Sequence, residues 1–374
     1  MRLEEITRYF PAGIAQGDAF INRVQERTVL KKNIIANRHM LLMAPRRYGK
    51  TSLVTQVAAE VDFSCAMIDF LAVHDDESVK AVLSDKIGRL VGELLPSVQQ
   101  AKEKLLSIFH GMRPELTLSA FGQKLVLHAP SNPSTTIMDL LLKLDETAVY
   151  FEKRAIVFID EMQQISFLEN AHSIEASIRH AVERSKNITY CFSGSSRHLL
   201  KQMFGDHARP LYRLCHTLEI ERMTLAHYEP YLADLSKRRW GQPLESDVFS
   251  KIMLLTEVHP FYVNALCQCL WIEDMAPNVL DVERAWRQYI KDNRHVIVDD
   301  VMKLSLNQKR VLIALAKYPV RELYGADFLV KVKMTPSSTR KAVEVLMAKD
   351  LVYLDQQQYY QLVDPAIAYY LADE

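Results

Sequence analysis

The residues best suited to chemistry lie between positions 44 and 52, in the segment APRRYGKTS. A loop that binds phosphate needs successive backbone N–H groups directed at the anion, a lysine for the outer oxygens and a hydroxyl for Mg²⁺. Gly49 supplies the unhindered backbone, Lys50 the positive charge and Thr51 the hydroxyl. The segment therefore predicts a nucleotide-binding loop, formed by Ala44, Pro45, Arg46, Arg47, Tyr48, Gly49, Lys50, Thr51 and Ser52.

Ala44 departs from the general pattern of such loops, which open with glycine. Pro45 follows Ala44 and favours an extended conformation for it, so a small side chain fits this position if no positive φ is required. A chance Gly-Lys-Thr sequence in an ordinary loop is the alternative interpretation. Only a nucleotide-binding loop predicts that further residues of a nucleotide site follow along the chain.

An acidic pair ends the apolar run AIVFIDE at residues 155 to 161. Ligands of open α/β sheets bind at the carboxyl ends of the strands, where this run would place Asp160 and Glu161. Asp160 then holds the Mg²⁺ to which Thr51 also binds, and Glu161 orients or deprotonates the attacking water. Acidic residues that merely begin a helix are the alternative. Their position about 110 residues after a phosphate loop favours the nucleotide site.

Polar and basic residues follow the next two apolar runs. Ser193 or Ser195, in FSGSSRHLL, would reach the γ-phosphate or the water, with Arg197 close by in sequence; serines that cap the next helix are the alternative. Arg209 and Arg213, in RPLYR, carry a planar guanidinium that donates to several phosphoryl oxygens at once. Solvated surface arginines are the alternative, so these residues are candidate catalytic groups alongside the acidic pair.

Five short apolar runs predict the scaffold that positions these residues. The runs are residues 39–44, 65–70, 155–160, 189–194 and 216–223. Strands that are apolar throughout and alternate with helices favour an α/β fold, with a parallel sheet covered on both faces. Residues 75 to 150 form an insertion with helical periodicity and a segment that suggests a short hairpin, and the sequence assigns no task to them.

The remaining sequence predicts two further domains. Four helical patterns separated by Pro and Gly signals occupy residues 224 to 295 and are typical of a small helical domain. Three helical patterns and two short β runs follow, in the order of a winged helix-turn-helix. We place a P-loop core at 1–222, a helical lid at 223–298 and a winged helix domain at 299–374.

Length, charge and cysteine content narrow the class of protein. The 374 residues exceed one ordinary domain. The 46 Lys and Arg balance the 46 Asp and Glu, so binding to nucleic acid or to a membrane surface must be local. The five cysteines lack paired metal-ligand spacing and indicate reduced thiols. No signal peptide and no apolar run near the ~18 residues of a membrane span are evident, so we expect a cytoplasmic protein.

Several segments, in this order, resemble the archaeal-type ATPase family of the STAND class of P-loop NTPases, relatives of AAA+ proteins. They are APRRYGKTSL, VFIDEMQ, FSGSSRHLL, RPLYR and TEVHPFYVN. The resemblance extends over nearly the whole chain, since the family also carries a helical lid and a C-terminal winged helix. It implies ATP and Mg²⁺ as cofactors and a switch between ATP and ADP states. The family loop often reads Pro-Arg-Arg before Gly-Lys-Thr, so Ala44 is less unusual within it.

The resemblance also implies roles for individual residues. Lys50 and Thr51 become the phosphate and metal contacts, Asp160 the acid on the metal side and Glu161 the catalytic acidic residue. Further implied contacts to the nucleotide are His259 at a phosphate, Pro260 near the base or ribose, and Phe20, Ile21 and Arg23 near adenine.

The predicted winged helix carries a local excess of basic residues. Ten Lys or Arg stand against five Asp or Glu between positions 300 and 350. Lys333, Arg340 and Lys341 lie on or near the expected recognition helix, where a basic patch contacts DNA phosphates. A winged helix that packs on the nucleotide domain as an intramolecular brake is the alternative.

These patterns lead to one main hypothesis and one alternative. The main hypothesis is an ATPase of low turnover whose nucleotide state controls conformation, assembly or partner binding. No sensor repeats or effector domain follow the winged helix in this sequence, so we expect its output to pass through a protein partner, self-association or DNA. The alternative is a non-hydrolysing, nucleotide-dependent DNA-binding regulator or adaptor, in which Glu161 matters little.

Overall fold

Two units make up the chain, and each has its own hydrophobic core. The computed structural model describes residues 3–95, 103–105, 107–109, 112, 114–119, 122–127, 133–355 and 357–373. The sheet unit comprises Arg23–Arg46 and Lys50–Ile220. The helical unit comprises Met1–Asn22, Arg47–Gly49 and Glu221–Glu374.

A five-stranded parallel sheet, in the order β2-β5-β6-β1-β7, forms the centre of the sheet unit. Its strands are β1 (Met40–Met43), β2 (Ser64–Asp69), β5 (Ala155–Asp160), β6 (Ile188–Gly194) and β7 (His216–Glu219). The three central strands are buried at nearly every position, as strands covered on both faces must be. The prediction of an α/β fold with a parallel sheet built from these five runs is confirmed.

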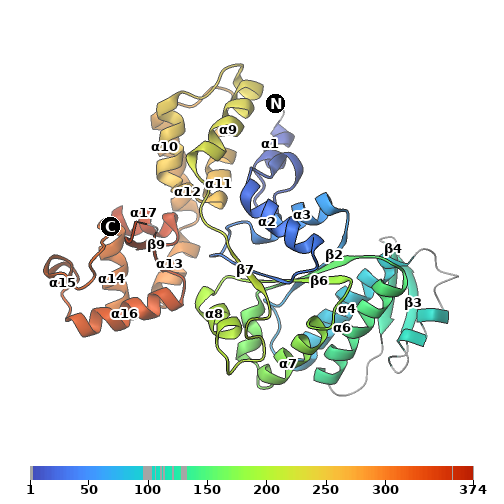
Figure 1. The fold of residues 1–374 in the computed structure, drawn as a ribbon. Helices are drawn as coiled ribbons and strands as arrows, with labels where there is room; N and C mark the ends of the chain where they lie inside the picture. Colours follow the sequence, from blue (N-terminus) through green and yellow to red (C-terminus); the bar gives the residue numbers. More distant parts are fainter. Residues whose placement is uncertain are drawn as a thin grey trace. The chain divides into compact units, whose positions relative to one another are not determined.

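Helices cover both faces of this sheet (Figure 1). Helices α4 (Asp76–Leu94), α6 (Pro133–Tyr150) and α7 (Ala171–Val182) lie on one face, and α2 (Val24–Ile35) and α3 (Lys50–Val61) lie on the other. The short helix η2 (Met162–Phe167) follows β5, and α8 (Arg197–Gly205) follows β6. Each strand end therefore leads directly into a helix or a short loop at the edge where ligands bind in such sheets.

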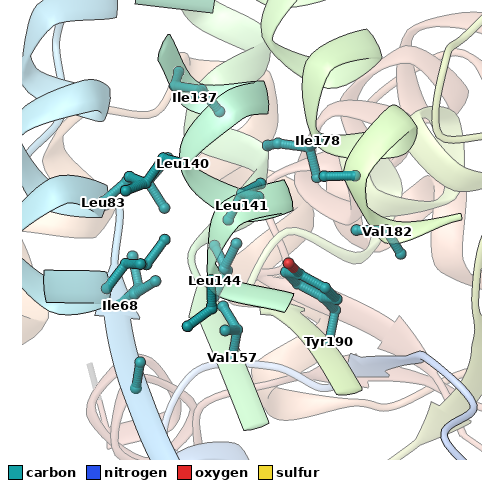
Figure 2. Close-up of a cluster of buried hydrophobic side chains, with 14 of the residues drawn as sticks. Ile68, Leu83, Ile137, Leu140, Leu141, Leu144, Val157, Ile178, Val182 and Tyr190 are labelled. Atoms are coloured by element: carbon teal, nitrogen blue, oxygen red, sulfur yellow. The ribbon is translucent and has the colours of Figure 1, made fainter. Parts of the chain in front are cut away.

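Helix α6 shows how the region between residues 75 and 150 contributes to this core. Its residues Ile137, Leu141 and Leu144 are fully buried, and Leu144, near the sheet end of the stripe, lies next to Val157 of β5 (Figure 2). Apolar residues at this spacing form one stripe of a helix. The suggested hairpin is present as the antiparallel strands β3 (Pro114–Ser119) and β4 (Gly122–Leu127). The insertion thus supplies two of the helices that cover the sheet.

The helical unit contains the lid and the winged helix. The region predicted as a lid, residues 223–298, contains α9 (Leu225–Trp240), α10 (Ser246–Thr256), α11 (Pro260–Trp271) and α12 (Val279–Asp292), and α13 (Arg294–Met302) crosses its predicted end. They are followed by α14 (Leu306–Lys317), α15 (Ala326–Val332), α16 (Pro336–Ala348), β8 (Val352–Leu354), β9 (Tyr360–Leu362) and α17 (Pro365–Asp373). The predicted order of three helices and a hairpin is confirmed. A single hydrophobic cluster includes side chains from both regions.

The N-terminal segment packs on the lid, although the boundaries proposed from the sequence grouped it with the P-loop core. It consists of α1 (Leu3–Tyr9) and η1 (Gly17–Ala19). The ring of Phe10 lies 5.0 Å from that of Trp271, and Tyr231 Oη donates to Tyr9 O at 2.7 Å. In the part of the chain that the structure describes, no helix combines the length and apolar character needed to cross a membrane.

Candidate active site

The loop between β1 and α3 has the backbone expected of a phosphate loop. Gly49 has a φ of 85°, in the left-handed region that favours glycine, and nothing lies within 4 Å of a Cβ built on it. Backbone conformation, rather than space, therefore favours glycine here. Ala44 is fully buried and is not among the described residues with positive φ. The loop consequently needs no glycine at its first position, which explains how Ala44 is accommodated.

Lys50 begins α3 and is 6% exposed. Its Nζ donates to Ala44 O and Pro45 O, each at 3.3 Å. These carbonyls partly satisfy a charge that would be costly to bury alone. Phosphate oxygens are stronger acceptors for an ammonium group than amide carbonyls, because the hydrogen bond is then assisted by charge on both partners.

Thr51 and Asp160 lie together at this edge of the sheet, although 109 positions separate them. Thr51 Oγ1 donates to Asp160 Oδ2 at 3.0 Å, and Asp160 Oδ1 accepts from Glu161 N at 3.0 Å. A hydroxyl beside a carboxylate suits Mg²⁺, which prefers oxygen ligands and uses one or two protein groups together with phosphate and water. The residues present therefore fit a divalent cation.

Glu161 is held by two donors. Its Oε2 accepts from Ser195 Oγ at 2.9 Å and from Gln163 Nε2. Ser195 and Gln163 are both buried, and Arg46 Nε donates to Ser195 Oγ at 3.4 Å. Glu161 itself has a φ of 52°, so its backbone also departs from the usual range. These contacts fix the carboxylate beside Asp160 and join it to the loop.

The structure brings Ser195, rather than Ser193, to the acidic pair. Ser193 lies within β6, is fully buried, and its Oγ has no hydrogen-bond partner among the described residues. Gln163 is a residue to which the sequence analysis gave no role. Its amide packs against Gly194, where an added Cβ would lie 1.9 Å from Gln163 Oε1. The only sequence signal for Gln163 is its place two residues after Glu161.

Arg209 and Arg213 have different surroundings. Arg209 Nε donates to Glu175 Oε2 at 3.1 Å, Nη2 binds the other carboxylate oxygen, and Nη2 also donates to Ser166 Oγ at 3.3 Å. The Glu175 side chain is fully buried, and its burial raises the pKa of the carboxyl although Arg209 opposes this. Arg213 is exposed, with its guanidinium 5.1 Å from the ring of Tyr212.

We expect Arg209→Ala and Arg213→Ala to separate stability from catalysis. Losing Arg209 leaves Glu175 buried without its partner, which costs about 2 kcal/mol, less than the ~3–5 kcal/mol of a fully buried pair because Arg209 is 29% exposed. The midpoint temperature of thermal unfolding should fall by roughly 5 °C in Arg209→Ala. Arg213→Ala should unfold at the same temperature as the wild type. If a neighbouring subunit uses this arginine in catalysis, the variant should lose turnover, and the activity per chain of the wild type should rise with protein concentration. Wild-type turnover at all concentrations in Arg213→Ala would remove Arg213 from the chemistry.

His259 and Pro260 begin α11 in the helical unit. Pro260 occupies the first helical position, where its missing N–H costs nothing. His259 is 3% exposed, lies against the rings of Tyr48 at 4.8 Å and Tyr262 at 5.0 Å, and its Nδ1 has no hydrogen-bond partner among the described residues. Burial, assisted by Arg222 and Arg47, holds the pKa of His259 well below its ordinary value. The imidazole is therefore neutral at physiological pH.

The residues implied at adenine lie where the chain passes from one unit to the other. Phe20 follows the last residue of η1, and Ile21 packs on the core of the helical unit. Arg23 precedes α2, is 4% exposed and pairs with Glu26 at 2.8 Å. Asn22 and Arg23 both have positive φ, of 50° and 53°. Asn tolerates this conformation better than most residues because its side chain bonds locally.

Comparisons with known proteins agree with this architecture. Residues 299–373 match the family described as a probable winged helix domain. Among solved structures, the chain is similar to a Walker-type ATPase of Pyrococcus abyssi, with a TM-score of 0.71 and 18% identity over 97% of this chain and 99% of that chain. Comparison of the sequence with curated proteins found no match.

The ORC2 protein of Aeropyrum pernix is also similar in fold. Its ADPNP-ADP complexes give a TM-score of 0.54 at 13% identity, and its ADP form gives 0.52 at 11%, each over 98% of this chain and 96% of that chain. At such identities the likeness concerns the fold. The chain has the α/β fold of P-loop ATPases, with a five-stranded parallel sheet, a helical region and a C-terminal winged helix domain.

Proposed function

We propose that the protein binds ATP with Mg²⁺ and hydrolyses it slowly, as a switch whose nucleotide state controls conformation, assembly or partner binding. The observation that carries this proposal is the meeting of Lys50, Thr51, Asp160 and Glu161 at one edge of the sheet. Support also comes from two proteins of similar fold, a Walker-type ATPase and the ORC2 protein in its ADPNP-ADP complexes. The segments that resemble the STAND class support a switch rather than a motor.

Each residue has a distinct role in this proposal. Lys50 and the backbone N–H groups of the loop bind the outer phosphates, and Thr51 and Asp160 hold Mg²⁺, which neutralises charge on the β- and γ-phosphate oxygens. Glu161 orients the attacking water and accepts its proton. Ser195 and Gln163 already occupy one oxygen of that carboxylate. Because these two donors occupy part of the Glu161 carboxylate, it has fewer free positions from which to accept a proton from water, and we therefore expect low turnover.

Phosphate release from ATP tests the proposal directly. We expect release below about 1 s⁻¹, at the low end of typical enzymes, and we expect EDTA to stop it. The same assay should be run with and without DNA, because the alternative is a nucleotide-dependent regulator that does not hydrolyse ATP. ATP binding by calorimetry together with undetectable release under all conditions would favour that alternative.

The alternative function rests on the winged helix. Arg340 and Lys341 are exposed on α16, the second helix of the expected helix-turn-helix, and Lys333 ends the helix before it. Thr335 caps α16 by accepting from Ser338 N. Arg340 pairs with Glu344 at 2.8 Å, but both side chains are at least 60% exposed. A pair this exposed contributes little and yields readily to a phosphate.

We expect any DNA binding to be weak, tolerant of sequence and steeply dependent on salt. The double change Arg340→Ala with Lys341→Ala should reduce the slope of log K against log salt by about two, one for each lost phosphate contact. The matched control is Lys309→Ala with Arg310→Ala on α14, which removes the same charge elsewhere on the domain. Absence of DNA binding by the wild type at low salt would contradict the DNA hypothesis and leave a protein partner or self-association.

A further inference from the structure

Arg222 connects four separate segments of the helical unit. It lies between β7 and α9, and its Nε donates to the hydroxyl of Tyr48 at 2.9 Å. Its Nη1 donates to Glu257 O at 3.2 Å and also binds the Glu257 carboxylate. Its Nη2 donates to Val363 O at 2.8 Å, and its guanidinium lies 5.4 Å from the ring of Tyr353. We name these five residues the Arg222 cluster.

All three nitrogens of the guanidinium have protein partners. The side chain is only 17% exposed, so the bonds form largely out of water. Hydrogen bonds from a charged donor are about twice as strong as neutral ones, and a planar guanidinium can bind several acceptors in fixed directions. Lysine cannot replace this geometry. Arg222 therefore holds its partners in one arrangement rather than contributing a general surface charge.

The partners come from functionally different regions. Tyr48 lies in the phosphate loop, one residue before Gly49 and two before Lys50. Glu257 follows the last turn of α10 in the lid. Tyr353 belongs to β8, and Val363 follows β9, so both belong to the wing region of the winged helix. One side chain thus joins the tip of the loop to the lid and to the winged helix.

A second set of contacts holds the same part of the loop. Tyr48 is 3% exposed, and its ring packs edge-on against His259 at 4.8 Å. The guanidinium of Arg47 lies 4.1 Å from the ring of Phe261, a favourable cation–π distance. Arg47 and Tyr48 are therefore both anchored in the helical unit, immediately before the residues that face phosphate.

We propose that Arg222 is a positioning residue for the phosphate loop, and that through Tyr48 it makes the retention of nucleotide depend on the winged helix. The proposal rests on the proposed function of the loop as a nucleotide site. Displacement of the wing removes the Val363 and Tyr353 contacts of Arg222, loosens its hold on Tyr48 and frees the backbone before Lys50. A partner that binds the wing therefore accelerates nucleotide exchange.

The test uses the full-length protein and the change Tyr48→Phe. This change removes only the hydroxyl that accepts from Arg222 and keeps the ring against His259. We expect a fluorescent ADP analogue to dissociate roughly tenfold faster, as the loss of one hydrogen bond to a charged group predicts. The matched control is Tyr231→Phe, which removes a hydroxyl bonded to Tyr9 O in the same unit, away from the loop. Dissociation from the control should equal that of the wild type.

Hydrogen exchange at the amides of residues 46 to 52 gives a readout without nucleotide. Exchange should increase in Tyr48→Phe and in Tyr353→Leu, and it should not change in Tyr231→Phe. If the wild type binds no nucleotide while these amides respond as expected, the proposed function fails and the positioning role stands. If loop exchange in Tyr48→Phe and Tyr353→Leu equals that of the wild type, Arg222 does not position the loop.

Discussion

We expect the change Lys50→Ala to remove ATP binding at concentrations where the wild type binds. Lys50 is buried at the start of α3, where its Nζ donates to two backbone carbonyls, and phosphate would provide stronger acceptors. Removing a charged donor from such a site costs about 3 kcal/mol, or roughly a 100-fold loss of affinity. Isothermal titration calorimetry with Mg²⁺ and ATP measures this directly.

The control for this variant addresses both charge and folding. Lys201→Ala removes the same charge from an exposed position on α8, where the ion pair with Glu219 is at the surface and contributes little. ATP affinity should not change in that variant. Thermal unfolding of Lys50→Ala should remain cooperative, because alanine is a good helix former at this position. Equal ATP affinities of the wild type and Lys50→Ala would show that this loop is not a phosphate site.

Glu161→Gln is expected to bind ATP with wild-type affinity and to lose about 100-fold in turnover, the range for a positioned general base. Glutamine keeps the shape of the side chain, and its carbonyl oxygen can still accept from Ser195, but it cannot take a proton from water. Single-turnover phosphate release measures the chemical step, and the nucleotide that co-purifies with the variant should be ATP rather than ADP.

Glu169→Gln is the matched control, since it makes the same chemical change at an exposed residue eight positions further along. Its turnover should equal that of the wild type. Unchanged hydrolysis in Glu161→Gln would instead assign Glu161 a structural role. Its hydrogen bonds to Ser195 and Gln163 would then be its main contribution, holding together this edge of the sheet.

The fold could be predicted from the sequence because its signals are local. Each strand of the sheet is a short apolar run, and burial on both faces requires such runs. The winged helix and its hairpin followed from the order of helical and β patterns. The position of the proposed phosphate loop could be predicted because Gly49, Lys50 and Thr51 have to be adjacent to perform the roles that we propose for them. Alanine at position 44 is compatible with this loop, because the backbone there does not adopt positive φ.

Contacts between distant residues could not be predicted in this way. Arg222 reaches Tyr48 over 174 positions and Val363 over 141, and no periodicity encodes such pairs. The choice between Ser193 and Ser195 depended on backbone beyond the last residue of β6, where the alternation of strand side chains no longer applies. Gln163 donates to Glu161 and packs against Gly194, and both contacts are seen only in the folded chain.

The N-terminal segment imposes an order on the folding of this protein during its synthesis. Phe10 and the lid residue Gln268, whose amide donates to Phe10 O, are 258 positions apart. At about 5 to 20 residues per second, a ribosome needs roughly 13 to 50 s to cover that distance. The sheet unit, which ends at Ile220, can fold in the meantime. Helix α1 and the adjoining Phe10 therefore wait with Ile6 and Phe10 uncovered until the residues that bury them are made, and a chaperone that binds nascent chains would find its target there.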